Sequence, residues 1–211
     1  MSKTLKYTIG IFAAILVVYF SLDIQNLEKH KAASAPASFN IADYTTKFWN
    51  DSLPVSIASA TQLSDLLKLL NENPESAFAK FGHKLGISKT WYFMAKSKGT
   101  IEKVDSEFLV LALEGNTKIK IATDFIFGNA VRDGSGKVNI NYFLNMTDFN
   151  NVSVAINKLV KEKVVSRLRK SAEVGQVLEY AGAFEINEEN IDLSNLSIIP
   201  VSAKISDGKP E

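Results

Sequence analysis

An arginine and an aspartate lie side by side at Arg132-Asp133, and they form the most specific pair of chemical groups in the sequence. We expect Arg132 to end an alternating strand and Asp133 to open the glycine-rich turn at residues 133–136. The planar fork of Arg132 can bind a carboxylate or a polyol through parallel hydrogen bonds. In a purely structural alternative, Asp133 caps its own turn and Arg132 pairs with a nearby acid.

A second group of polar and aromatic residues follows at Tyr142, Phe143 and Asn145. The asparagine is suited to a polar pocket, whereas the two rings are also suited to core packing. Arg132, Asp133 and Asn145 are therefore the candidate ligand-binding residues. We expect them to converge on one concave surface that holds a small polar ligand.

Residues typical of enzymes are sparse. His83 is the only histidine after residue 38, and it has neither a neighbouring nucleophile nor the spacing of a metal ligand. The acid pair Glu188-Glu189 falls in a predicted turn, where carboxylates are usually solvated. We expect no catalytic residue, no metal and no cofactor. The alternative is a periplasmic hydrolase that pairs Asp133 with a second carboxylate.

Composition narrows the classes of protein without selecting one. The chain has 211 residues, 46% of them hydrophobic, with 24 basic against 23 acidic side chains, as in ordinary globular proteins. The absence of cysteine from the sequence excludes disulfides, cysteine-bound zinc and a lipidated cysteine. The near-neutral net charge gives no electrostatic reason to expect a nucleic-acid partner.

The N-terminal segment carries the strongest single pattern. Residues 7–22 form an apolar run without a charged side chain, and Lys3 and Lys6 precede it. We expect a single-pass anchor in the inner membrane, with the following domain on the periplasmic side because the lysines precede the span. The alternative is a signal peptide cleaved near Ala35.

The expected organisation has five parts. They are a membrane anchor at residues 1–22, a tether at 23–38, a helical subdomain at 39–88, a β-barrel domain at 89–205 and a tail at 206–211.

Apolar residues at helical spacing predict four helices. They are expected at residues 39–51, ended by Pro54, at 61–71, from Asn73-Pro74 onward, and at 150–171. The last carries many lysines and arginines, which could face anionic lipid or solvent.

From residue 91 the apolar residues alternate with a period of two, which predicts strands. The expected strands are 92–104, 107–113, 118–122, 176–186 and 196–205, with a further hairpin between 125–132 and 137–143. The order favours an α+β fold, an OB-like five-stranded β-barrel with a long helix inserted before the last two strands. A plain α+β sandwich would produce a similar pattern.

Short motifs are spread over residues 39–205, and the most specific is Gly128-Asn-Ala-Val-Arg-Asp133. The others include Ala79-x-Phe81-Gly82, Gly99-Thr-Ile-Glu-Lys-Val104, Phe143-Leu-Asn145, Asn157-Lys-Leu159 and Gly182-Ala-Phe184. Together they resemble a bacterial family of predicted periplasmic lipoproteins, which is catalogued as a domain of unknown function.

The resemblance implies an exported protein whose gene lies near those of sugar ABC transporters. The sequence departs from the family in two ways: it lacks the lipobox cysteine, and it has Asn145-Met146 where the family has Asn-Gln. An N-terminal helix would then replace the lipid as the anchor.

These observations predict a non-catalytic, membrane-anchored module on the periplasmic face of the inner membrane. Its expected partners are the membrane, through residues 7–22, and a small polar ligand or a component of a sugar transporter. A nucleic-acid partner is not expected, because export and balanced charge both oppose it.

Overall fold

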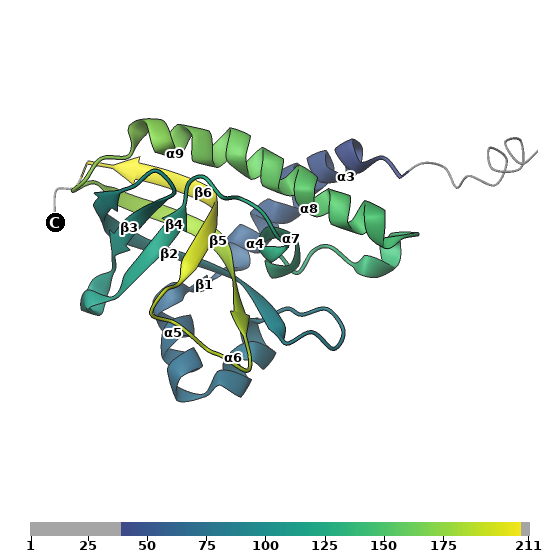
Figure 1. The fold of residues 1–211 in the computed structure, drawn as a ribbon, viewed down its shortest axis with the longest axis horizontal. Helices are drawn as coiled ribbons and strands as arrows, with labels where there is room; N and C mark the ends of the chain where they lie inside the picture. The colour runs from purple at the N-terminus through teal and green to yellow at the C-terminus, as the bar shows by residue number, and fades with distance from the viewer. Residues whose placement is uncertain (1–38, 208–211) are drawn as a thin grey trace, which may run out of the picture. The chain divides into compact units, whose positions relative to one another are not determined.

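Five strands close into a barrel that forms the centre of the domain. The computed structural model describes residues 39–207. The strands are β2 (Thr90–Val104), β3 (Phe108–Ala112), β4 (Lys118–Ala122), β5 (Val177–Asn187) and β6 (Ser197–Ser206). They follow the order β2-β3-β4-β6-β5, and β5 pairs back onto β2 to close the sheet (Figure 1). The neighbours are antiparallel except β4 and β6, which are parallel. This closed barrel with its helices confirms an α+β fold of the OB type.

The barrel interior is filled by the apolar half of each alternating strand. In β3, for example, Leu109 and Leu111 are buried whereas the residues between and beside them are partly exposed. The same core receives Leu63, Leu66 and Leu70 from a helix outside the barrel. Burial of these side chains supplies most of the stabilisation, at about 1.5–3 kcal/mol for each large apolar group.

Two helices cover the lower part of the sheet in Figure 1. They are α5 (Leu63–Glu72), which follows the two-residue strand β1 (Thr61–Gln62), and α6 (Pro74–Phe81). The Asn73 side chain accepts a hydrogen bond from the backbone N–H of Ser76, and Pro74 takes the first helical position. This cap confirms the predicted start of the helix, because proline needs no N–H partner there.

The first helical segment is longer than the sequence predicts. It runs through α3 (Ile41–Lys47), the π-turn η1 (Phe48–Ser52) and α4 (Leu53–Ser59), so Pro54 does not end it. In the π-turn the backbone N–H of Leu53 donates to the carbonyl of Phe48, five residues earlier. The proline then lies in the first turn of α4, where its missing N–H is tolerated.

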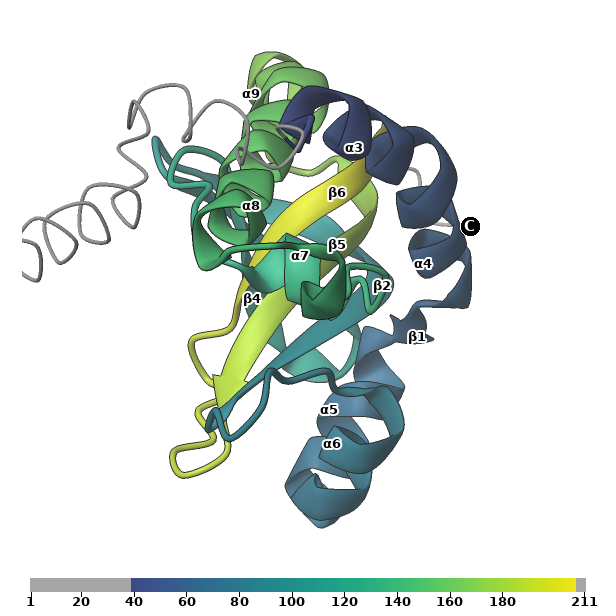
Figure 2. The same cartoon turned by 90° about the vertical axis from the view of Figure 1, so that its right-hand side faces the viewer.

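The connection between β4 and β5 contains no hairpin, so the predicted pairing of residues 125–132 with 137–143 is wrong. The chain instead forms α7 (Ala130–Gly134) and a short 3₁₀ turn, η3 (Ile140–Tyr142). A long helix follows, made of α8 (Met146–Val160), the π-turn η4 (Lys161–Val165) and α9 (Ser166–Ser171). Figure 2 shows α7 between this helix and the sheet. The insertion of a long helix before the last two strands is confirmed.

The predicted membrane anchor at residues 7–22 and the tether at 23–38 lie outside the described residues. Between residues 39 and 207, no helix has both the length and the apolar character needed to cross a bilayer.

The basic face of the long helix is largely occupied by contacts within the domain. Lys161 and Arg169 both lie near the carboxylate of Asp124, at 3.6 and 3.3 Å. The Lys163 ammonium lies 5.3 Å from the centre of the Trp49 ring. These contacts favour a solvated, partly paired face over a lipid-binding one.

Candidate functional site

Helix α7 closes one end of the structured core. All five of its residues are buried, although the segment includes an arginine and an aspartate. A Cβ atom at Gly134 would lie 2.8 Å from the carbonyl oxygen of Phe93 in β2, so only glycine lets the helix approach the sheet this closely. The burial of a charged turn against a sheet indicates that its charges must be paired inside the protein.

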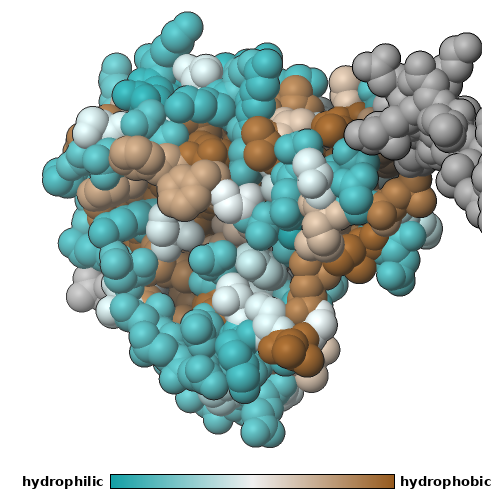
Figure 3. Space-filling view, turned by 45° about the vertical axis from the view of Figure 1, so that its right-hand side comes forward, coloured by the Kyte–Doolittle hydropathy of each residue, from teal (hydrophilic) through white to brown (hydrophobic). Residues whose placement is uncertain are grey.

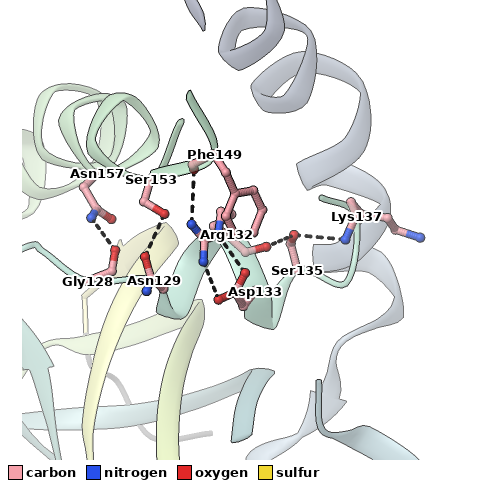
Figure 4. Close-up of polar contacts among 9 residues, drawn as sticks. All are labelled: Gly128, Asn129, Arg132, Asp133, Ser135, Lys137, Phe149, Ser153 and Asn157. Carbon is pink, nitrogen blue, oxygen red and sulfur yellow. Dashed lines mark hydrogen bonds and ion pairs between the residues drawn. The ribbon is translucent and has the colours of Figure 1, made fainter. Parts of the chain in front are cut away.

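Arg132 and Asp133 pair with each other. The Nε and Nη2 atoms of Arg132 donate to the two carboxylate oxygens of Asp133 at 2.7 and 2.8 Å, and both side chains are almost fully buried (Figure 4). The remaining nitrogen, Nη1, donates to the backbone carbonyl of Phe149 at 3.2 Å. The guanidinium also lies 3.6 Å from the centre of the Phe149 ring. The Arg132 guanidinium, which could have bound a ligand, therefore binds the adjacent Asp133.

One face of α8 binds the whole motif that contains this pair. The Ser153 hydroxyl donates to the side-chain oxygen of Asn129 at 2.9 Å, and the Asn157 amide donates to the carbonyl of Gly128 at 2.9 Å (Figure 4). Phe149, Ser153 and Asn157 are spaced by four residues, which places them on the same side of the helix. The motif at residues 128–133 therefore fastens α8 to the barrel.

Asn145 does not join the Arg132–Asp133 pair. It is exposed and caps the N-terminus of α8, where its side-chain oxygen accepts from the backbone N–H of Asp148 at 2.8 Å. Phe143 packs edge-on against the rings of Tyr44 and Phe149. Tyr142, by contrast, is 71% exposed. The expected convergence of Arg132, Asp133 and Asn145 is not present, because each side chain already has a structural partner.

A cleft of about 450 Å³ lies beside the buried pair. Two chain segments line it from opposite sides, one at residues 83–85 and the other at residues 136–142. Asp133 is part of its lining and Arg132 is not. At this cleft a predicted site residue, Asp133, meets a concave surface.

His83 and Lys137 meet at this cleft. His83 pairs with Tyr92 through backbone hydrogen bonds of 2.9 and 2.8 Å, which fix its position beside β2. A Cβ at Gly136 would lie 2.6 Å from the imidazole Cε1 and Nε2, so the ring rests directly on that glycine. Burial lowers the pKa of His83, the Lys137 charge lowers it further, and the Asp133 carboxylate opposes both.

Lys137 is the unpaired cation of the cleft. No salt bridge joins its ammonium to a carboxylate of residues 39–207. Lys84, on the opposite side, lies 3.4 Å from the Glu188 carboxylate and 4.4 Å from the centre of the Trp91 ring. Hydrogen bonds from Trp91 and Lys89 hold the pKa of Glu188 at about 2, so Glu188 stays charged and offsets Lys84.

A wider hollow of about 640 Å³ separates the loop at residues 126–129 from α8. Its amide and hydroxyl groups at Asn129, Ser153 and Asn157 are those that fasten α8 to the barrel. Because these groups are already bonded, the 450 Å³ cleft is the better candidate site.

The cleft has the chemistry of a binding site for a small anion. It offers an ammonium at Lys137, an imidazole at His83, and the exposed amide and phenol of Asn139 and Tyr142. Within the described part of the chain, no three His, Asp or Glu side chains cluster closely enough to hold a metal ion. Sequence reasoning did not select Lys137, since a lysine after a Gly-Ser-Gly turn has no distinctive pattern.

Comparison with solved structures supports the fold. The chain is similar to the crystal structure of an OB-fold protein from Thermotoga maritima, with a TM-score of 0.72 and 24% sequence identity. The match covers 80% of this chain and 99% of that one. A search of curated proteins finds no match.

A protein-family model matches residues 12–204, which is most of the chain. The matched span contains the barrel up to residue 204 in β6, the motif at residues 128–133 and the cleft. The family is described as predicted periplasmic lipoproteins, so the barrel is a periplasmic, membrane-associated domain. The chain belongs to the DUF2291 family of predicted periplasmic lipoproteins.

Proposed function

We propose that this protein is a non-catalytic accessory module, held at the periplasmic face of the inner membrane by residues 7–22, whose cleft binds a small anionic polar solute. A carboxylated sugar is the solute class that we expect. The link to sugar uptake rests on the gene neighbourhood that the family resemblance implies, and a transporter component is the corresponding protein partner.

The unpaired ammonium of Lys137 in the cleft is the observation that carries the proposal. An ammonium without a carboxylate partner can bind a ligand carboxylate without first breaking an internal salt bridge. His83 has a lowered pKa and is therefore mostly neutral at pH 7, so one ring nitrogen can accept a hydrogen bond from a hydroxyl. Asn139 and Tyr142 add groups that suit a polyol.

A binding role is favoured over the hydrolase alternative by the state of Asp133. Both of its carboxylate oxygens accept hydrogen bonds from Arg132. Asp133 is also the only carboxylate in the cleft lining within residues 39–207, whereas hydrolysis by paired carboxylates needs a second acid roughly 5–9.5 Å away.

The test is a thermal-shift screen of the fragment 39–211 against neutral sugars and sugar acids. This fragment contains the closed barrel and its core, and the match to the similar crystal structure, which is aligned over 99% of its own length, covers 80% of this chain. A ligand at about 100 times its Kd stabilises by about 2.7 kcal/mol, which raises Tm by roughly 5–10 °C in a domain of this size. We expect such a rise with sugar acids and none with their neutral counterparts.

Two lysine variants make the screen specific. Lys137→Ala should abolish the rise and leave the unliganded stability within about 0.5 kcal/mol, because the side chain is exposed. Lys170→Ala, an exposed lysine in the last turn of α9, is the matched control and should keep the rise. An equal rise in both variants would remove the cleft as the binding site.

A further inference from the structure

The two loops that flank the cleft carry large apolar side chains that face solvent. Ile87 is 99% exposed in the loop after α6, and Tyr142, Leu144 and Met146 are 71%, 74% and 54% exposed in the segment that leads into α8. We call these four residues the apolar rim. Tyr142 of the rim lines one side of the cleft, and Ile87 follows two residues after Leu85, which lines the other side.

The packing of the second loop explains why its side chains project outward. Phe143 is held inside by edge-on contacts with the rings of Tyr44 and Phe149, at 5.3 and 5.2 Å between centroids. Its neighbours Tyr142 and Leu144 therefore point away from the protein. Asn145 then caps α8 and fixes the direction in which the loop ends. The exposed side chains therefore belong to a loop that is anchored through Phe143 and Asn145.

Both loops lie at the same end of the domain, on the right-hand side of Figure 1. Figure 3 brings that side forward and shows hydrophobic side chains gathered along it. Exposed apolar groups that form a contiguous patch mark a surface for contact with a protein or a membrane, whereas scattered ones do not.

The route of the chain favours a membrane. The described domain begins at Phe39, directly before α3, and Tyr44 of α3 contacts Phe143 beside the rim. The described part of the chain therefore begins at the end that carries the rim. The residues before it include the apolar run at residues 7–22, for which we propose a place in the bilayer. A bilayer that holds residues 7–22 would then be connected through the chain to that end of the domain.

The chemistry of the rim also fits a lipid surface. Leucine, isoleucine and methionine partition into the boundary of the acyl chains, and tyrosine prefers the headgroup layer. Lys137, which belongs to the second loop, lines the cleft, and its ammonium can contact an anionic headgroup. No acidic side chain other than the paired Asp133 lines the cleft between them in residues 39–207.

We propose that the apolar rim docks on a bilayer of anionic phospholipid and holds the mouth of the cleft at the level of the headgroups. The proposal goes beyond solute binding, because it assigns a second surface and an orientation to the domain. The cleft would then meet its solute at the membrane surface. The rim acts by insertion of its side chains, so docking does not require an occupied cleft.

Vesicle sedimentation of the fragment 39–211 tests this docking without the contribution of residues 7–22. The probe is a vesicle of phosphatidylethanolamine with phosphatidylglycerol, compared with one of phosphatidylcholine alone. We expect the fragment to bind both and to bind the anionic vesicle more tightly. The difference should shrink in Lys137→Ala and in high salt.

Rim variants supply the decisive comparison. Leu144→Asp combined with Ile87→Asp should lower the partition coefficient tenfold or more, because each change removes an apolar group and adds a charge that resists insertion. Both positions are exposed, so the variant should melt at the wild-type temperature. Val174→Asp is the matched control, since Val174 is 64% exposed in the turn after α9, at the opposite end of the long helix, and should have no effect.

A gain-of-binding variant gives an independent readout. Leu144→Trp should bind more tightly, and its fluorescence should be quenched by lipids brominated near the headgroups.

Absence of vesicle binding by the wild-type fragment, or equal binding by the rim variant and the wild type, would overturn the proposal. A change of oligomeric state in the rim variant would instead assign the rim to contact between copies of the chain, and would also overturn it. Loss of the sugar-acid response alone would overturn solute binding and leave docking in place.

Discussion

Two adjacent segments, the buried turn of α7 and the exposed loop that follows it, use their polar residues in opposite ways. In α7, the Arg132 guanidinium donates to Asp133 and to the Phe149 carbonyl, so its three nitrogens all have protein partners. A few residues later, Lys137 and Asn139 are exposed and line a cleft. The most distinctive charged motif is therefore structural, and the binding chemistry that we propose lies in the ordinary residues beside it.

The largest expected effect tests whether the buried Arg132–Asp133 pair of α7 is structural. Asp133→Ala leaves the buried guanidinium of Arg132 without its counter-charge, and such a loss usually costs about 3–5 kcal/mol. Urea unfolding of the fragment 39–211 measures it.

An exposed pair provides the control for Asp133. The Lys103 ammonium lies 2.7 Å from the Asp105 carboxylate in a solvated position, so Asp105→Ala should destabilise the fold far less than Asp133→Ala does. Similar losses for the two variants would mean that burial of the Arg132–Asp133 pair does not determine its importance.

A smaller effect is expected where α8 is fastened to the barrel. Asn157 is buried and donates to the Gly128 carbonyl, so Asn157→Ala leaves a carbonyl without its partner and should cost about 1–3 kcal/mol. Lys158→Ala, at the exposed neighbouring position, should change the free energy of unfolding by under about 0.5 kcal/mol. If the two variants unfold at the same urea concentration, the motif at residues 128–133 does not depend on α8.

The smallest expected effect is the pH dependence of stability that arises at His83, beside the exposed loop. Because the pKa of His83 is lowered by burial and by Lys137, the folded protein binds fewer protons there than the unfolded chain does. The stability that depends on a neutral His83 is complete above pH 6.5 or so and decreases as the pH falls through that value. His83→Gln should remove this part of the pH dependence between pH 7.5 and 5.5.

NMR titration of the fragment 39–211 gives the direct measurement, since His83 is its only histidine. The imidazole resonance should titrate below pH 6.5, and Lys137→Ala should move the midpoint upward. A wild-type midpoint at or above 6.5 would contradict the described environment of the ring.

The helices and strands of the barrel could be predicted because each depends on short-range patterns. Alternation in β3 and β4, the Asn73-Pro74 cap and the long apolar stripe of α8 are all properties of neighbouring residues. The hairpin expected at residues 125–143 failed for the opposite reason. Helix α7 is stable there because its charged turn is paired and covered by α8, a contact between segments that local periodicity does not contain.

The cleft could not be predicted from the sequence, because His83 and Lys137 come from segments 54 positions apart and neither has a characteristic neighbour. Arg132 and Asp133 were expected to bind a ligand or, in the structural alternative, to pair with a nearby acid and cap a turn, and their mutual salt bridge removes the free fork that a ligand would need. Asn145 was recognised as polar and became a helix cap, since a cap requires only the next three residues.

The sequence by itself determined the alternating strands, the amphipathic helices and their caps, because hydrophobic periodicity and backbone hydrogen bonding act over a few residues. These patterns fit both a barrel and a plain α+β sandwich, and the pairing of β5 with β2, far apart in the sequence, closes the barrel. Only the tertiary structure decided which polar groups are paired within the protein and which remain free in solvent. Burial makes an unpaired charge costly, so closing the barrel forced Arg132 onto Asp133, while Lys137, a few residues further on, stayed in solvent and kept its charge available.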